Sequence, residues 1–195
     1  MTVGDTSGDA ATLINASGGT WDIADDSGIL LGSSTSSIVN AGLLEKTGGT
    51  EVSPIAPNIE NSGTIAVTSG TLDLEGAVTG AGTDKVSGAS TLEFDSSVSG
   101  NQTVDFTNSP AGGASVIDLI DPRGFSGQIE NFASPDTVDL SGDWVFSGFS
   151  ENSNGTLGTL TLASGGIEHS FTFVGDYMAS DFNIISGTTT VIAHT

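Results

Sequence analysis

The chain has 195 residues, enough for one sizeable domain or two small ones, and its formal net charge is −21. Only Lys46, Lys85 and Arg123 are strongly basic, and the unopposed acidic charge excludes nucleic acid and anionic membrane surfaces as expected partners. The absence of cysteine excludes disulfides and thiol chemistry. Because no apolar run reaches about 18 residues, no membrane-spanning helix is expected.

A short pattern built around asparagine recurs in the first third of the chain. Segments 13–16, 38–43 and 59–65 share it, and their asparagines, Asn15 and then Asn40 and Asn61, are 25 and 21 residues apart. A period of roughly 20–25 residues, with short apolar strands and Asn/Gly turns, is typical of a solenoid whose coils bury their faces against one another. The repeat therefore predicts stacked coils over residues 1–130.

A second pattern alternates apolar and acidic residues. It reads apolar-acid-apolar at 21–23, 72–74, 92–94, 104–106, 117–119 and 138–140. In a strand, the two apolar side chains point to one face and the acid to the other. We expect the apolar pairs to fill the interior of the solenoid and the acids to lie on its outer surface.

The pattern changes near residue 130. Segments 155–162 and 167–174 are strand-like and are joined across Gly165 and Gly166, which predicts an antiparallel hairpin. A polar bend at 176–182 with one short helical turn and a last strand at 188–193 complete the region. An exposed solenoid end needs a cap, so we interpret residues 131–195 as a β-rich capping module. The predicted fold is all-β: a right-handed parallel β-helix with a hairpin-rich C-terminal cap.

Several segments resemble a known class of repeats. Segments 41–50, 61–65 and 69–74 resemble the repeats of very large bacterial surface proteins, similar to filamentous-haemagglutinin and autotransporter-passenger β-helices, and segment 121–127 resembles the C-terminal end of such proteins. The resemblance implies a secreted, extracellular or cell-surface bacterial protein with an adhesin-like or matrix role. It supplies no catalytic or binding residues.

Acidic residues are the candidate cation ligands. Five of them come from the alternating pattern: Asp73, Glu93, Asp105, Asp118 and Asp139. Stacked on one outer face, they would repel one another, and bound Ca²⁺ would relieve that repulsion. Their spacings differ, so a shared face for all five is one possibility. The alternative is a solvated acidic face that keeps a repetitive β-protein from aggregating.

Catalysis is not expected, although some parallel β-helices act on polysaccharides. A carbohydrate-binding or carbohydrate-active β-helix stays as the alternative function. We expect Arg123 to pair with a carboxylate, and His169 to contact a neighbouring strand. The aromatic residues Trp21, Trp144 and Tyr177 could stack on sugar rings, but scattered as they are, they fit a role in the core better.

The leading prediction is a non-enzymatic extracellular structural or adhesive rod. The N-terminus lacks the basic start and apolar core of a secretory signal, which leaves open a fragment of a larger protein or export directed by the C-terminus. An uncapped N-terminal coil would expose a β-edge, which predicts end-to-end self-association into filaments. A host or matrix glycan is the other expected partner.

Overall fold

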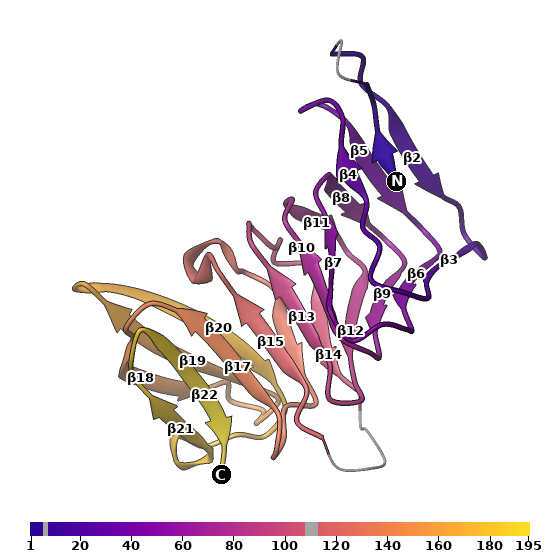
Figure 1. Ribbon diagram of the computed structural model, residues 1–195. Coiled ribbons are helices and arrows are strands. Elements are labelled where there is room, and N and C mark those ends of the chain that lie inside the picture. Colours follow the sequence, from indigo (N-terminus) through magenta and orange to yellow (C-terminus); the bar gives the residue numbers. More distant parts are fainter. Residues whose placement is uncertain (6–7, 108–112) are drawn as a thin grey trace.

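The computed structural model describes residues 1–5, 8–107 and 113–195 (Figure 1). Over these residues the chain winds into a β-solenoid of about six turns and ends in a layer of antiparallel strands. A typical turn supplies one short strand to each of three sheets, and successive turns pair in parallel. The predicted all-β solenoid is confirmed.

Each sheet is a stack of strands from successive turns. Sheet 1 contains β7 (Val52–Ile55), β10 (Thr71–Leu74), β13 (Thr91–Phe94), β15 (Val116–Leu119), β17 (Thr137–Ser141), β22 (Thr189–His194) and β21 (Phe182–Ile185). Sheet 2 contains β2 (Thr12–Asn15), β5 (Ser37–Asn40), β8 (Asn58–Asn61) and β11 (Val78–Gly80). Sheet 3 contains β3 (Thr20–Ile23), β6 (Leu43–Lys46), β9 (Thr64–Val67), β12 (Thr83–Val86), β14 (Thr103–Phe106), β16 (Gln128–Glu130), β20 (Ile167–Val174), β19 (Leu157–Ser164) and β18 (Val145–Glu151).

Two further strands and two short helical turns complete the described elements. β1 (Thr2–Val3) pairs in parallel with β4 (Leu30–Leu31), and the 3₁₀ turns are η1 (Pro122–Gly124) and η2 (Ala179–Asp181). No helix in the described ranges has the length and apolar character needed to cross a bilayer.

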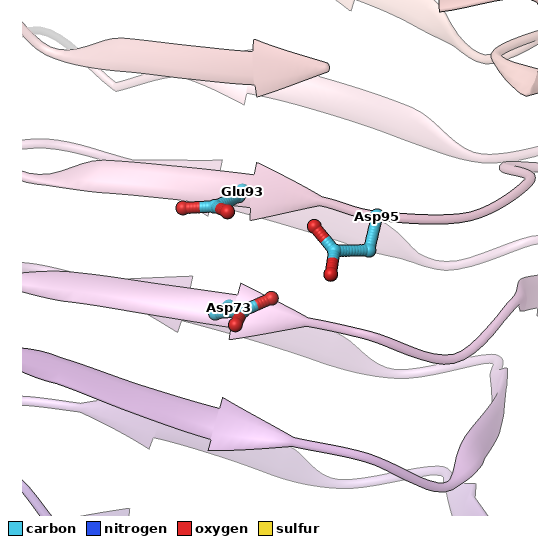
Figure 2. Close-up of side chains that lie close together, drawn as sticks. All are labelled: Asp73, Glu93 and Asp95. Carbon is cyan, nitrogen blue, oxygen red and sulfur yellow. The ribbon is translucent and has the colours of Figure 1, made fainter. Parts of the chain in front are cut away.

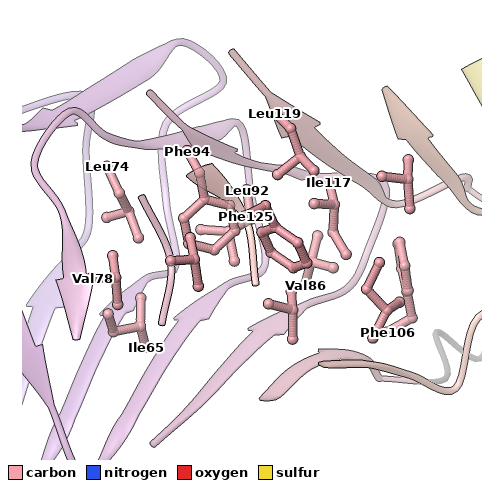
Figure 3. Packing of buried hydrophobic residues seen from close by; sticks show 14 of the residues in the cluster. Ile65, Leu74, Val78, Val86, Leu92, Phe94, Phe106, Ile117, Leu119 and Phe125 are labelled. Atoms are coloured by element: carbon pink, nitrogen blue, oxygen red, sulfur yellow. The ribbon is translucent and has the colours of Figure 1, made fainter. Parts of the chain in front are cut away.

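Alternation along most strands places apolar residues inside, and in β10, β13, β15 and β17 it places the acids outside, as predicted. In β13, Glu93 is on the outer face (Figure 2), whereas Leu92 and Phe94 are buried. Leu92 lies in register between Leu72 and Ile117, so aliphatic side chains form continuous ladders through the interior (Figure 3). The stack thus buries one uninterrupted apolar core.

Glycines let the turns stack closely at the corner between sheets 2 and 3. A Cβ atom on Gly42 would lie 2.3 Å from the carbonyl oxygen of Gly19, and one on Gly63 would lie 2.2 Å from that of Gly42. No side chain fits between backbones at that separation. The period of the repeat therefore depends on a small residue returning to this corner.

The repeated asparagines do not lie in turns, contrary to the sequence interpretation. Asn15, Asn40 and Asn61 are the last residues of β2, β5 and β8, and all three are buried. The Nδ2 of Asn15 donates to the Oδ1 of Asn40 (2.8 Å), and that of Asn40 donates to the Oδ1 of Asn61 (2.9 Å). Amide-to-amide bonds can run from coil to coil only because the side chains point inward. We call this row the asparagine ladder.

The C-terminal region changes from parallel to antiparallel pairing. β17 is parallel to β15 and antiparallel to β22, while β20 is parallel to β16 and antiparallel to β19. The predicted hairpin, the final strand and the short helical turn are confirmed as β19–β20, β22 and η2. β18 ends sheet 3 and carries a register shift between Phe146 and Gly148.

Candidate functional site

Four of the five predicted cation ligands stack on one face. Asp73 is in register with Glu93, Glu93 with Asp118, and Asp118 with Asp139, on the outer side of β10, β13, β15 and β17. The four acidic side chains point outward, because side chains alternate along these strands and the residues on either side of each acid are buried in the core. We call these four residues the acidic column.

The fifth predicted residue lies elsewhere. Asp105 is in β14 of sheet 3, beside Lys85 of β12 and Glu130 of β16. Its Oδ1 accepts a hydrogen bond of 2.7 Å from the Nδ2 of Asn131. Asp105 is therefore separate from the acidic column.

A carboxylate outside the five predicted ligands joins the column. Asp95 immediately follows β13, and one carboxylate oxygen from each of Asp73, Glu93 and Asp95 lies within 4.8 Å of the other two. Figure 2 shows the three side chains together. One oxygen of Asp73, Oδ1, is buried and has no hydrogen-bond partner among the described residues. The sequence does carry a signal for Asp95, because Glu93 and Asp95 are two residues apart, a spacing that gives one face of an extended chain.

Burial and mutual repulsion make these carboxyls harder to ionise. Partial burial, followed by the charges of Asp95 and Glu75, raises the pKa of Asp73 to about 6. Partial burial, followed by the charges of Asp73 and Asp118, raises the pKa of Glu93 to about 7. Burial is also the main cause of the raised pKa of both Asp118 and Asp139.

No basic side chain of the described residues forms an ion pair with the column. The one ion pair within the described ranges joins Lys46 Nζ to Asp26 Oδ1 at 3.1 Å, and neither residue belongs to the acidic column. The carboxyls can then lower their repulsion by sharing protons or by binding a cation. Ca²⁺ accepts carboxylate oxygens at about 2.3–2.6 Å, so ligands on opposite sides of the ion stand about 5 Å apart. The separations among Asp73, Glu93 and Asp95 fit that size.

Residues considered for other chemistry have structural roles. Trp144 and Tyr177 are buried in the cap, as expected for core residues. Arg123 does not pair with a carboxylate, contrary to expectation: its Nη2 donates to the carbonyl of Ser164 at 2.9 Å, and its guanidinium lies 4.9 Å from the centre of the Trp144 ring. The Nε2 of His169 is 2.8 Å from the carbonyl oxygen of Phe125, in a neighbouring turn.

Lys46 is buried in the core, which the sequence interpretation did not include. Its Nζ has three protons and lies within hydrogen-bond distance of four acceptors, the carbonyls of Asp25 and Gly48, both at 2.8 Å, the carboxylate of Asp26 at 3.1 Å and the hydroxyl of Ser53 at 3.0 Å. Lys46 thus fastens two loops of adjacent coils. Period-2 alternation from Leu44 is the signal that places it inside.

Asp84 is a second buried charged residue that the sequence interpretation missed. It extends the asparagine ladder, because its Oδ1 accepts a 2.9 Å bond from the Nδ2 of Asn61. The Asp84 side chain is fully buried and its Oδ2 has no partner in the described residues. Burial raises the pKa of Asp84 to about 7, and the bond from Asn61 offsets part of that rise.

In comparisons with known proteins, no protein-family model and no curated protein matches the sequence. The class that the geometry defines is an acidic parallel β-solenoid.

Proposed function

We propose that the chain is a non-enzymatic extracellular structural or adhesive rod whose acidic column binds divalent cations of the Ca²⁺ type. The fold supports the rod, since each turn contacts mainly its neighbours and repeats the same section. The surface supports the cation, because the net charge of −21 comes from carboxylates that greatly outnumber the basic side chains.

One observation carries this proposal: Asp73, Glu93, Asp118 and Asp139 stand in register on one sheet, with raised pKa values and no paired cation in the described chain. A solvated surface has no need to hold carboxyls at a separation where they oppose each other's ionisation. Extracellular Ca²⁺ modules bind in the range of about 10⁻⁴–10⁻³ M, which a site built from surface carboxylates can reach.

The test compares two double variants at neutral pH. Ca²⁺ is titrated calorimetrically into the wild-type chain, into Asp73→Asn/Glu93→Gln, and into the charge-matched control Asp105→Asn/Glu130→Gln, and thermal melting is recorded with and without the ion. We expect heat and a higher Tm for the wild type and the control, and at least about tenfold weaker binding for the column variant, since it removes two charged ligands. Equal affinities for all three chains would contradict a site at the column.

Removal of the ion supplies the second half of the test. With a chelator, the column variant should melt at a higher temperature than the wild type, because it no longer contains the repulsion. A column variant that is less stable than the wild type in chelator would show that these carboxylates support the fold rather than a cation.

A further inference from the structure

The N-terminal end of the solenoid leaves two strands with an open edge. Sheet 2 ends at β2 and sheet 3 ends at β3, each paired on one side only. The carbonyls of Ala11 and Asn15 accept from the backbone N–H groups of Ser37 and Ala41. Because alternate residues of a parallel strand bond to opposite neighbours, Thr12 and Ile14 present their backbone groups to the open edge.

The same end exposes part of the core. A hollow of about 730 Å³ is lined by apolar side chains that include Met1, Leu13, Trp21, Ile23, Ile29 and Leu44. Leu13 and Trp21 are only partly buried, whereas their partners in the next turn, Ile38 and Leu44, are fully buried. The hollow therefore continues the apolar ladders at the point where they end.

The asparagine ladder also stops there with an unused acceptor. Asn15 Nδ2 donates to the Oδ1 of Asn40 and to the carbonyl of Leu43 at 2.9 Å, which uses both of its protons. Its Oδ1 accepts no hydrogen bond from the described residues, although Asn15 is only 2% exposed. In the next two turns, the corresponding oxygens of Asn40 and Asn61 each accept an amide from the preceding coil.

We propose that this N-terminal face is a docking site for a parallel β-coil of the same pattern, carried by another polypeptide segment. The partner places an aliphatic residue over Leu13, an amide side chain that donates to Asn15 Oδ1, and an apolar residue over Trp21. The inference rests on the proposed structural role, and it differs from the predicted end-to-end self-association because the partner is a segment of another polypeptide and not a second copy of this chain.

Other occupants do not match these features. A lipid or small apolar molecule fills the hollow but cannot pair with the strand edges. Two N-terminal faces related by a two-fold axis would bring the Asn15 oxygens together without a donor. The C-terminal end of another copy offers the antiparallel strands β18 and β21, and β18 is irregular between Phe146 and Gly148. A coil with the x-aliphatic-x-Asn sequence of β5 and β8 satisfies edge, hollow and ladder together.

The experiment uses a peptide of the chain's own second turn as the partner. A labelled peptide with the sequence of residues 36–48, which contains β5 and β6, is titrated with the full chain in chelator, so that the result is independent of cation binding. We expect saturable anisotropy. A peptide with Asn40→Val should bind about tenfold more weakly, since it leaves the oxygen of Asn15 unpaired.

Two variants of the chain test the edge itself. Ile14→Pro removes the outward N–H of a residue whose side chain is 65% exposed, so the coil keeps its inner pairing while the edge is blocked. Ile14→Thr is the matched control, because it removes the same exposed side chain but keeps the N–H. We expect Ile14→Pro to abolish binding and Ile14→Thr to change affinity by less than about threefold.

Tryptophan fluorescence gives a measurement on the unmodified chain. Trp21 lines the hollow whereas Trp144 is buried, so docking should shift the emission to the blue. The absence of saturable binding or of this shift would overturn the proposal, as would equal binding by Ile14→Pro. Oligomers of the chain alone that Ile14→Pro dissolves would assign the face to a second copy and also overturn it. None of these results depends on the acidic column, which the calcium titration tests separately.

Discussion

At the residue scale, Asp84 is a buried carboxyl that accepts the last amide of the asparagine ladder, although it lies in sheet 3 in register with Ile65, and the strand position in register with Asn61 in the next turn is Gly80. An ionised carboxylate in the core has one oxygen with no partner among the described residues. The fold therefore favours the protonated acid. Burial raises the pKa of Asp84 from 3.8 to about 7.

The buried carboxyl of Asp84 predicts a pH-dependent stability. A group whose pKa is raised by folding contributes stability below its unfolded pKa and loses it as the pH rises through the folded one, here between about pH 4 and pH 7. Asp84→Asn should raise the free energy of unfolding at pH 8 by on the order of 2–4 kcal/mol and flatten its pH profile. Urea denaturation at pH 5 and pH 8 measures both effects.

In the Asp84→Asn variant, part of the dependence of stability on pH remains, because folding also raises the pKa values of Asp73 and Glu93 in the acidic column. Asp105→Asn is the control, since Asp105 lies outside both the core and the column. An Asp84→Asn chain with the wild-type profile would mean that the carboxyl is already compensated in the wild-type protein.

At the element scale, the corner between sheets 2 and 3 has no room for a side chain at Gly42. In Gly42→Ala, the added methyl group would meet two backbone oxygens, those of Gly19 at 2.3 Å and Ala16 at 2.6 Å. Backbone cannot rotate away as a side chain can, so we expect a loss of about 1–3 kcal/mol. Gly148→Ala is the control, because nothing lies within 4 Å of the methyl group it would add, and the loss should stay within about 0.5 kcal/mol. Chemical denaturation that ranks the two variants equally would contradict this account.

The sequence predicted the strands well because the alternation of apolar residues and the period of the repeat can both be recognised in the sequence alone. It also predicted four members of the acidic column, since the residues between Glu93 and Asp118 span one whole turn. Asp105 lies outside the column because it is only half a turn beyond Glu93 and so belongs to another sheet, and the sequence left open whether all five acids share a face. To assign an apolar-acid-apolar segment to one sheet or the other, the number of residues in each coil must be known as well as the pattern.

The hydrogen-bond partners of the buried polar residues were beyond the sequence pattern for a different reason. Asn/Gly segments favour turns in isolation, but here a neighbouring amide in each coil makes burial of Asn40 favourable. Lys46 and Asp84 are similar, since Lys46 donates to the carbonyl of Asp25 and Asp84 accepts from Asn61, both on the preceding coil. Partners that are brought together only by stacking leave no signal within one strand.

At the scale of the whole molecule, the direction of pairing decides how the rod responds to tension. Backbone hydrogen bonds join each coil to the next. A force that separates the two ends of the rod therefore acts on the hydrogen bonds of one coil at a time. Coils are 19 to 28 residues long, as the register of β9 with β12 and of β1 with β4 shows. Each coil that peels away should lengthen the chain by about 60–100 Å.

Under tension the protein would then extend in small steps, one coil after another, instead of unfolding all at once. Optical-tweezer extension should give a series of low-force steps of that size, followed by a larger one when the antiparallel cap opens. A single rupture of the whole solenoid would show that packing of the apolar core, and not the backbone hydrogen bonds between coils, sets its mechanical strength. The repeat that specifies the fold would thereby also set the length that each broken coil releases under load.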